Sequence, residues 1–401
     1  MIDEVGGRAA DLIERGHEAI TRSDDALAYV RFSEAATLAE RRSDLGDVRA
    51  RVLAGLAQLE RARGAVVEAD QLAARASDAL AGIAKPAPIA TVEVAVETAD
   101  STGCPDPEGE LRRALGLATA IADESVRQLA TVRVLRALGN HLRTRGGYAE
   151  AASCLRDAVS VASARFGSES LELAGVLNDL GVVSKFAGDW AEAVRCYTAV
   201  GAIQDSHGLS GSPDRATLLH NLGGLEHARG DFERAAPFAR QALDLHVQTL
   251  GEDHVATDLD RVALAAILDG GGRSSEAAEL LEAAIPRLRS RLGAHPEVAA
   301  ALNNLGAIAQ EAGDLERAEA CYREALTIKE TRVGSESPTL AISLNNLGTV
   351  LRRKGSLEEA SAVYARAVAL LEGAVPDDHP TLRALRRNQA TLRGSSGDDG
   401  P

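Results

Sequence analysis

The sequence has few aromatic residues, although its apolar content is ordinary. Phe, Trp and Tyr together make up 3% of the 401 residues, whereas apolar residues as a whole make up 45%. The apolar side chains are therefore mainly those of alanine and leucine. Both residues are strong helix formers, whereas strands favour aromatic and β-branched residues. This composition predicts closely packed helices and an all-α fold.

The chain also lacks an excess of basic residues, and its formal net charge is −15. Nucleic acids and anionic membranes attract basic surfaces, so neither is expected as a partner. No apolar run reaches the roughly 18 residues that a membrane-spanning helix needs. The first residues, Met1-Ile2-Asp3-Glu4, lack the basic and apolar regions of a signal peptide. We expect a cytoplasmic protein.

Cysteine is scarce as well, with four residues in the chain. Cys154 and Cys196 are 42 positions apart, and Cys321 occupies the same position of a later sequence repeat. Equivalent positions in successive repeats are typical of small buried side chains, so free thiols are favoured over disulfides.

The main feature of the sequence is a repeat of about 42 residues. The segment Leu-Asn-Asn-Leu-Gly occurs at 302–306 and again at 344–348. Turn glycines follow at steps of 42, 42, 42, 41 and 42 residues: Gly146, Gly188, Gly230, Gly272, Gly313 and Gly355. A small residue lies seven positions before each of them: Gly139, Gly181, Gly223, Ala265, Gly306 and Gly348. A fixed period of this length indicates one supersecondary unit copied along the chain.

The conserved spacing has a simple physical interpretation. A turn glycine ends the first helix of a unit, because glycine tolerates the left-handed conformation found there. Small residues at the crossing let the first and second helices approach closely. A single helix pair cannot bury both of its faces, so the units are expected to stack.

The repeat divides the chain into five parts. Residues 1–84 contain two less regular helix pairs, with helices expected at 3–20, 25–42, 45–63 and 66–82. Residues 85–106 interrupt the pattern with two proline clusters, and the alternation of Val92, Val94 and Val96 favours an extended segment. This part is either a linker or a worn repeat that kept only a second helix, at about 108–123. Residues 107–377 form the regular array, 378–393 a capping helix, and 394–401 a disordered tail.

On these residues the chain resembles the tetratricopeptide repeat family, and most closely its kinesin light chain type. Leu-Gly in the first helix, followed by alanine, an aromatic residue or leucine, and alanine in the second helix, is that family's pattern. The resemblance implies a right-handed superhelix of antiparallel helix pairs, whose first helices line a concave groove. Such grooves commonly hold an extended or helical segment of another protein, and no cofactor is implied.

By the same resemblance, groove positions fall two and three residues before the Leu-Gly glycine, and one and four or so after it. Candidate groove residues are Asn140, Arg143, Asn178, Asp179, Lys185, His220, Asn221, His227, Asn303, Asn304, Gln310, Asn345, Asn346 and Arg352. An amide both donates and accepts, so it can hold a peptide backbone, and arginine can bind a carboxylate. The alternative is that the asparagines bond neighbouring helices within the array.

No residue pattern indicates catalysis or a metal site. The histidines belong to no compact ligand motif, and no phosphate loop or nucleophile elbow is found. We therefore expect a non-enzymatic scaffold that binds a partner protein segment. The alternative is a regulatory receptor whose array binds a small peptide or ligand and changes conformation. The oligomeric state is not predicted.

Overall fold

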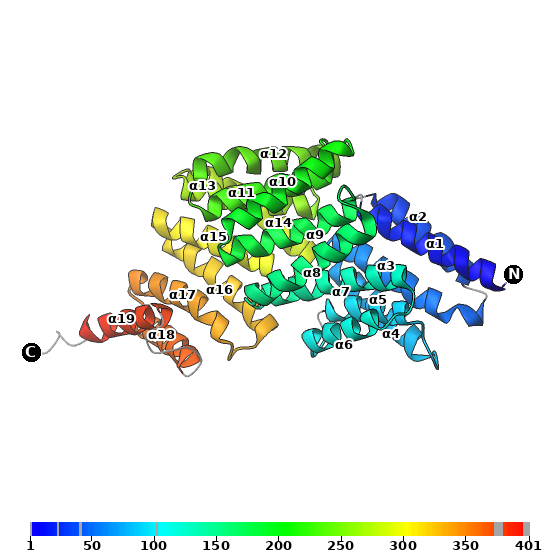
Figure 1. Cartoon of the computed structure of the whole chain (residues 1–401). Helices are drawn as coiled ribbons and strands as arrows, with labels where there is room; N and C mark the ends of the chain where they lie inside the picture. The colour runs from blue at the N-terminus through cyan, green and yellow to red at the C-terminus, as the bar shows by residue number, and fades with distance from the viewer. Residues whose placement is uncertain (1, 22–23, 40–41, 102, 373–379, 396–401) are drawn as a thin grey trace, which may run out of the picture. The chain divides into compact units, whose positions relative to one another are not determined.

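The structure is a computed structural model that describes residues 2–21, 24–39, 42–101, 103–372 and 380–395 (Figure 1). These residues form α-helices with two short 3-10 turns, and no strand is found among them. The all-α fold, a solenoid of antiparallel helix pairs, is therefore confirmed.

The helices fall into two compact units, Met1–His254 and Val255–Pro401, here called unit 1 and unit 2. Unit 1 contains α1 (Ile2–Thr21), α2 (Asp25–Ala39), α3 (Gly46–Ala62), α4 (Val66–Ala81), α5 (Pro88–Ala99), α6 (Pro107–Thr119), α7 (Glu124–Thr144), α8 (Tyr148–Phe166), α9 (Leu171–Ala187), α10 (Trp190–Ser206), α11 (Pro213–Ala228) and α12 (Phe232–Leu250). Unit 2 contains α13 (Val255–Gly270), α14 (Ser274–Leu292), α15 (Pro296–Ala312), α16 (Leu315–Val333), α17 (Ala341–Lys354), α18 (Leu357–Leu371) and α19 (Pro380–Ser395). Odd-numbered helices up to α17 are the first helices of a pair, and even-numbered ones are the second.

The turn glycines do what their spacing predicts. Gly188, Gly313 and Gly355 have φ between 78° and 84°, in the left-handed conformation that ends the first helix of each pair. An aspartate often follows, as at Asp189 and Asp314, and its side chain accepts a hydrogen bond from the next helix's first turn. At these positions a two-residue turn therefore ends one helix and begins the next.

The small residues mark the closest helix crossing of each pair. A Cβ added at Gly181 would lie 2.5 Å from Tyr197, and one added at Gly348 would lie 2.7 Å from Tyr364. The two tyrosines are almost fully buried, with exposed fractions of 1% and 0%. Alanine, leucine and these few aromatic side chains thus fill the core between paired helices.

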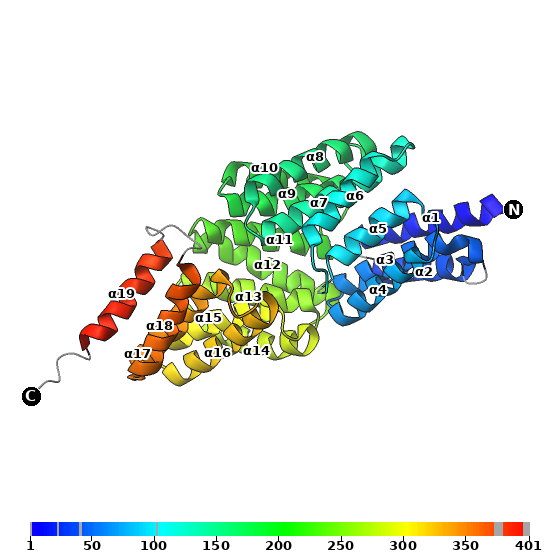
Figure 2. The same cartoon turned by 90° about the horizontal axis from the view of Figure 1, so that it is seen from below.

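The first helices of unit 1 form a continuous inner layer. Successive first helices contact one another from α1 to α11, and Figure 2 shows α1, α3 and α5 side by side. In addition, α1 contacts α9, four repeats away. Since repeats in a solenoid normally contact only their neighbours, unit 1 curls far enough for its inner layer to meet itself.

The expectation of an extended segment within 85–106 is wrong, because Pro88–Ala99 forms helix α5. This helix packs against α3, α4, α6 and α7, so almost its whole circumference is buried. With α6 it forms a complete helix pair, and the interruption is a worn repeat that retains both helices.

Three further expectations concern small segments. All four cysteines are free thiols, as expected, with Cys196 and Cys321 buried. The end of the chain is helical to Ser395, and α19 packs on α17 and α18. The rest of the tail, 396–401, and the segment 373–379 lie outside the described residues.

Candidate functional site

All the candidate groove residues lie on first helices. Asn140 and Arg143 are on α7, Asn178, Asp179 and Lys185 on α9, and His220, Asn221 and His227 on α11; Asn303, Asn304 and Gln310 are on α15, and Asn345, Asn346 and Arg352 on α17. Most are half-buried, whereas Asn221 is buried and Arg352 is exposed. These are the helices that the resemblance names, and whether a partner binds these residues stays a prediction.

Some of the asparagines bond one another between neighbouring repeats. Asn221 donates from Nδ2 to Asn178 Oδ1 at 2.7 Å, and Asn388 of α19 donates to Asn345 Oδ1 at 2.9 Å. In each pair the two residues are 43 positions apart. At Asn178, Asn221 and Asn345 the asparagines thus bond neighbouring helices within the array, which was the alternative to binding a partner.

The same register holds an ion pair one repeat earlier. Arg136 donates from Nε to Asp179 Oδ2 at 2.8 Å, again across 43 positions. Position three before the Leu-Gly glycine in one repeat therefore bonds position two before it in the next. We call this row of contacts the inter-repeat ladder. The sequence reasoning missed Arg136 and Asn388, although the 43-residue spacing would have identified both.

The ladder is interrupted at Asn303, and two amide oxygens of α15 have no donor. Asn303 Oδ1 and Gln310 Oε1 are buried, and neither accepts a hydrogen bond within the described part of the chain. The two residues are seven positions apart, two helical turns, so they share one face of α15. A buried polar atom without a partner costs about 1–3 kcal/mol and is rare in folded proteins.

Three candidate residues form a second group near the ends of their helices. Arg143, Lys185 and His227 each lie four positions after the small residue at the helix crossing, on α7, α9 and α11. Phe186 lies between the first two, with Lys185 Nζ 4.9 Å and Arg143 Cζ 5.8 Å from its ring centroid. Burial, followed by the nearby charge of Arg143, lowers the pKa of Lys185.

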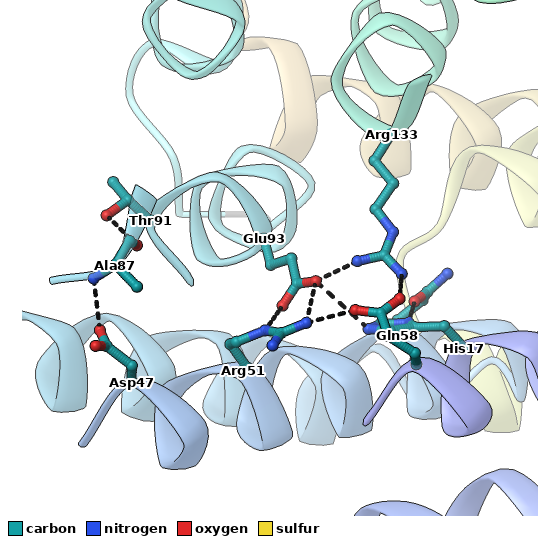
Figure 3. Close-up of polar contacts among 9 residues, drawn as sticks. His17, Asp47, Arg51, Gln58, Ala87, Thr91, Glu93 and Arg133 are labelled. Atoms are coloured by element: carbon teal, nitrogen blue, oxygen red, sulfur yellow. Dashed lines mark hydrogen bonds and ion pairs between the residues drawn. The ribbon is translucent and has the colours of Figure 1, made fainter. Parts of the chain in front are cut away.

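A cluster of charged and polar residues on α1, α3, α5 and α7 was not expected. It consists of Glu14, His17, Arg51, Gln58, Glu93 and Arg133, and we call it the inner ion cluster. Arg51 donates to Glu93 at 2.7 Å and to Glu14 at 2.6 Å. Arg133 also bonds both carboxylates, 3.1 Å from Glu14. Figure 3 shows both guanidinium groups pointing at Glu93.

The electrostatics of the cluster follow from its burial. Burial acts to raise the pKa of Glu93, but Arg51 and Arg133 outweigh it and lower that pKa to about 2. Burial, with help from Arg133, lowers the pKa of His17 to about 3, so its ring is neutral at pH 7. Two arginines therefore balance two carboxylates, and the neutral His17 donates from Nδ1 to Gln58 Oε1 at 3.0 Å.

Three cavities lie along the inner layer of unit 1, with volumes of about 330, 510 and 240 Å³. Gln58 and Arg136 line all three, and His17 lines the two larger ones. Asn140 and Asp179 line the first, and Asn178 lines the third. Some candidate residues thus line cavities in unit 1.

The sequence reasoning did not identify the inner ion cluster. One signal was available: Arg51 and Glu93 are 42 positions apart, one repeat period. Opposite charges at equivalent positions of successive first helices predict an ion pair between repeats.

Two other kinds of site are absent from the described ranges. No group of three or more His, Cys, Asp and Glu side chains is arranged to hold a metal ion. No helix there combines the length and apolar character needed to cross a membrane.

Comparison with solved structures finds similar helical repeat proteins. BtubC, also called BKLC, from P. vanneervenii is 23% identical, with 56% of this chain and 90% of that chain covered and a TM-score of 0.46. A protein from P. anserina described as a kinesin light chain with nearly identical TPR-like repeats is 23% identical, with coverages of 47% and 89% and a TM-score of 0.42. A Rap protein complexed with competence and sporulation factor is 12% identical, with coverages of 87% and 98% and a TM-score of 0.54. Among curated proteins, none matches the sequence.

The family models give a clearer result. Tetratricopeptide repeat models match residues 130–204, 214–290, 279–331 and 297–373, and a second model of the same description matches 178–246. These segments cover more than half of the chain and include the helix pairs from α7 to α18. The family's fold is typically a non-enzymatic scaffold for protein interactions, and no catalytic family is indicated. The chain belongs to the tetratricopeptide repeat family.

Proposed function

We propose that this chain is a non-enzymatic scaffold that binds an extended segment of another protein along the first helices of its repeats. The family fold supports a protein-interaction role, and the half-buried amides of α15 and α17 support a backbone-binding one. An amide side chain can bond any peptide backbone regardless of the partner's sequence.

The observation that carries the proposal is the pair of buried amide oxygens on α15. Asn303 Oδ1 and Gln310 Oε1 lack donors, although Asn178 and Asn345, which are equivalent to Asn303 in their repeats, have them. A bound segment in extended conformation carries backbone N–H groups that could supply both donors. The unpaired oxygens would then be a cost of the free protein that binding removes.

Neighbouring residues of unit 2 fit the same role. Asn304 and Asn346 are half-buried on α15 and α17, adjacent to the ladder positions Asn303 and Asn345. Arg352 is exposed near the end of α17 and adds a positive charge for an acidic side chain or a free C-terminus of the segment.

The test begins with the partner that co-purifies with the full chain from its native host, identified by mass spectrometry. Calorimetric titration then compares the parent with the double variant Asn303→Ala, Gln310→Ala. We expect binding to weaken about tenfold or more, because two amide hydrogen bonds of about 0.5–1.5 kcal/mol each are lost. The melting temperature should not fall, because the oxygens removed have no partner in the free protein.

Asn388→Ala is the matched control, because it removes an amide that does have a partner. It leaves Asn345 Oδ1 without its donor, so stability should fall by about 1 kcal/mol while binding at α15 is retained. The proposal fails if the double variant binds the partner normally but melts well below the parent.

The cavities of unit 1 favour a second candidate, a receptor for a small peptide or other ligand. The largest has a volume of about 510 Å³ and is lined by α1 as well as α7, and α1 also closes on α9. A ligand bound there would contact α1 and α7 together, which would couple binding to the arrangement of these helices. The test is to add a small-molecule fraction from the host cells to the protein without any protein partner. A receptor should then show a higher melting temperature of unit 1, and an unchanged one would contradict this candidate.

A further inference from the structure

One cavity of unit 1 lies where its first helix meets a helix four repeats away. This cavity of about 240 Å³ is lined by Ile20 of α1 and by Ala174, Gly175 and Asn178 of α9, two helices that contact each other. We call it the α1–α9 cavity; α3, α7, α10 and the start of α11 supply its other walls. A water molecule takes up about 30 Å³, whereas drug-sized ligands occupy about 300 Å³ or more. The space therefore suits a small molecule.

A buried glutamine brings an unused acceptor to this cavity. Gln204 of α10 lines it and is 4% exposed, and its Oε1 accepts no hydrogen bond within the described part of the chain. Its Nε2 donates to the backbone oxygen of Asp214 at 3.0 Å. That bond fixes which way the amide points, because exchanging its oxygen and nitrogen would bring two oxygens together.

An unpaired acceptor in this position selects the group that can bind it. A buried oxygen without a donor is a cost to the free protein, and a ligand that brings an N–H group removes that cost. Asp214 lines the cavity next to Gln204 and adds a negative charge on the same side. The donor that suits this side best is therefore an ammonium group.

Three other side chains bring unused donors to the same cavity. Arg136 donates from Nε to Asp179, and neither of its Nη groups has an acceptor among the described residues. Gln58 and Asn178 each accept a hydrogen bond through the amide oxygen, and neither amide nitrogen donates to a described residue. Arg136, Gln58 and Asn178 all line the cavity. A carboxylate has the oxygens that these donors lack.

The backbone of α9 keeps the guanidinium group at the cavity wall. A Cβ added at Gly175 would lie 3.3 Å from Nη2 of Arg136 and 3.5 Å from Nη1. Both nitrogens therefore lie against a residue that lines the cavity, where a larger side chain would crowd them.

The remaining wall of the cavity is apolar. It consists of Ile20, Leu171, Ala174, Val200 and Leu209. Water can bond the polar groups, but it gains nothing from apolar side chains, whereas an aliphatic group of a ligand would remove apolar surface from water. The cavity thus combines an acceptor for an ammonium group, donors for a carboxylate and a surface for a hydrocarbon chain.

We propose that the α1–α9 cavity binds a free α-amino acid with an aliphatic side chain, its ammonium group at Gln204 and Asp214 and its carboxylate at Arg136. The proposal rests on the receptor candidate for unit 1, to which it gives a class of ligand. Such a ligand contacts α1 and α9 at once, so its binding stabilises the closure of unit 1.

The first test titrates L-alanine, L-valine and L-leucine separately into the full chain by calorimetry. The best binder is then compared with the two molecules that lack one of its charged groups; for leucine these are 4-methylpentanoate and 3-methylbutylamine. The amino acid should bind about tenfold or more tightly than either, because each analogue leaves charged hydrogen bonds unmade. No binding by any of the three amino acids, or equal binding by an analogue, would overturn the proposal.

Variants then locate the two ends of the ligand. Gln204→Met removes the acceptor and keeps the length of the side chain, so the amino acid should lose its advantage over the carboxylate analogue. Arg136→Gln should instead remove its advantage over the amine analogue. Each variant is decisive alone, so misfolding of one, detected by its melting temperature, leaves the other to decide. A variant that weakens the amino acid and both analogues equally would indicate a structural role and refute the assignment.

Two matched controls make the same chemical changes elsewhere. Gln248→Met alters an exposed glutamine of α12, and Arg156→Gln alters an arginine that pairs with Glu192 of the next repeat. Neither residue lines the cavity, so both controls should bind the amino acid as the parent does.

The proposals can fail separately. A host fraction that raises the melting temperature, together with no binding of these amino acids, would refute the ligand class and leave the receptor candidate standing. Neither result affects partner binding through Asn303 and Gln310, which belong to unit 2.

Discussion

At the residue scale, a few close approaches decide what each position tolerates. Gly181 and Gly348 each face a buried tyrosine sixteen positions later, and no Cβ fits between them. The sequence predicted these crossings because small residues recur there. It could not predict which asparagines are paired, since Asn178, Asn303 and Asn345 share one register and only their contacts differ. That difference depends on small displacements between neighbouring helices.

Gly348→Ala should destabilise unit 2 by about 1–3 kcal/mol, because its Cβ would stand 2.7 Å from the buried Tyr364 ring. Gly116→Ala is the matched control, because Gly116 is exposed within α6 and its added Cβ would meet nothing within 4 Å. That control should be stabilising by about 0.5–1 kcal/mol. Urea unfolding of both variants gives the comparison, and a Gly348→Ala protein as stable as the parent would refute the crossing.

At the element scale, helix α5 explains why periodicity misled the sequence reasoning. Val92, Glu93, Val94 and Ala95 are consecutive and all buried, because α5 is surrounded by α3, α4, α6 and α7. A helix buried on all sides loses the 3.6-residue pattern by which an amphipathic helix is identified. Valine alternation then resembles a strand. The regular repeats escaped this error because their glycine and alanine spacings are independent of hydrophobic periodicity.

Hydrogen exchange tests this correction. The backbone amides of Val92–Val96 should exchange about as slowly as those of the neighbouring α3, because both helices are packed within unit 1. Limited proteolysis should likewise spare 88–99. Rapid exchange or early cleavage within this range would instead support the extended linker.

The inner ion cluster makes α5 essential to unit 1. Glu93→Ala should cost about 3–5 kcal/mol, because it leaves Arg51 and Arg133 facing a buried position with one carboxylate between them. Glu150→Ala provides the comparison, since Glu150 pairs with Arg112 between repeats on the exposed surface, and the loss should be at most about 1 kcal/mol. Thermal unfolding of the two variants should separate them clearly; equal effects would mean that burial does not strengthen the Glu93 contacts.

At the scale of the whole molecule, the repeat arithmetic predicts nearly all of the architecture. The helix pairs from α7 to α18 follow the repeat spacing, and α19 is the expected capping helix. The period could not predict the division into two units after His254, nor the contact between α1 and α9. Both depend on the small rotation between repeats, which accumulates along a solenoid and has no signature in spacing.

Acid should destabilise unit 1 in two steps. The pKa of His17 is lowered to about 3 in the folded state, so its contribution is full above about 6.5 and is lost as pH falls toward 3. The pKa of Glu93 is lowered to about 2, so its contribution is full above about 4.5 and is lost as pH falls through 2. Both groups therefore make the folded state less stable as pH falls. Glu97 acts in the opposite direction between about pH 8 and 4.5, because burial raises its pKa to about 8. Unfolding measured from pH 4.5 to pH 3 should therefore show falling stability.

His17→Gln should flatten the pH dependence between 6.5 and 3, because glutamine does not titrate. His207→Gln is the control, since His207 is exposed and bonds only a backbone carbonyl, that of Glu169. The control should leave the slope nearly unchanged. A slope that is the same in both variants would assign the acid sensitivity to other groups.

The contact between Glu14 and Arg133 also bears on how the chain folds. These residues are 119 positions apart, whereas contacts in a simple repeat array are local. During synthesis, α1 leaves the ribosome long before α7 exists. Glu14 therefore cannot form its contact with Arg133 until α7 has been made. Folding of unit 1 therefore has a late step in which its first helix docks on repeats made afterwards. The high sequence separation of that step should make it slower than the stacking of neighbouring pairs.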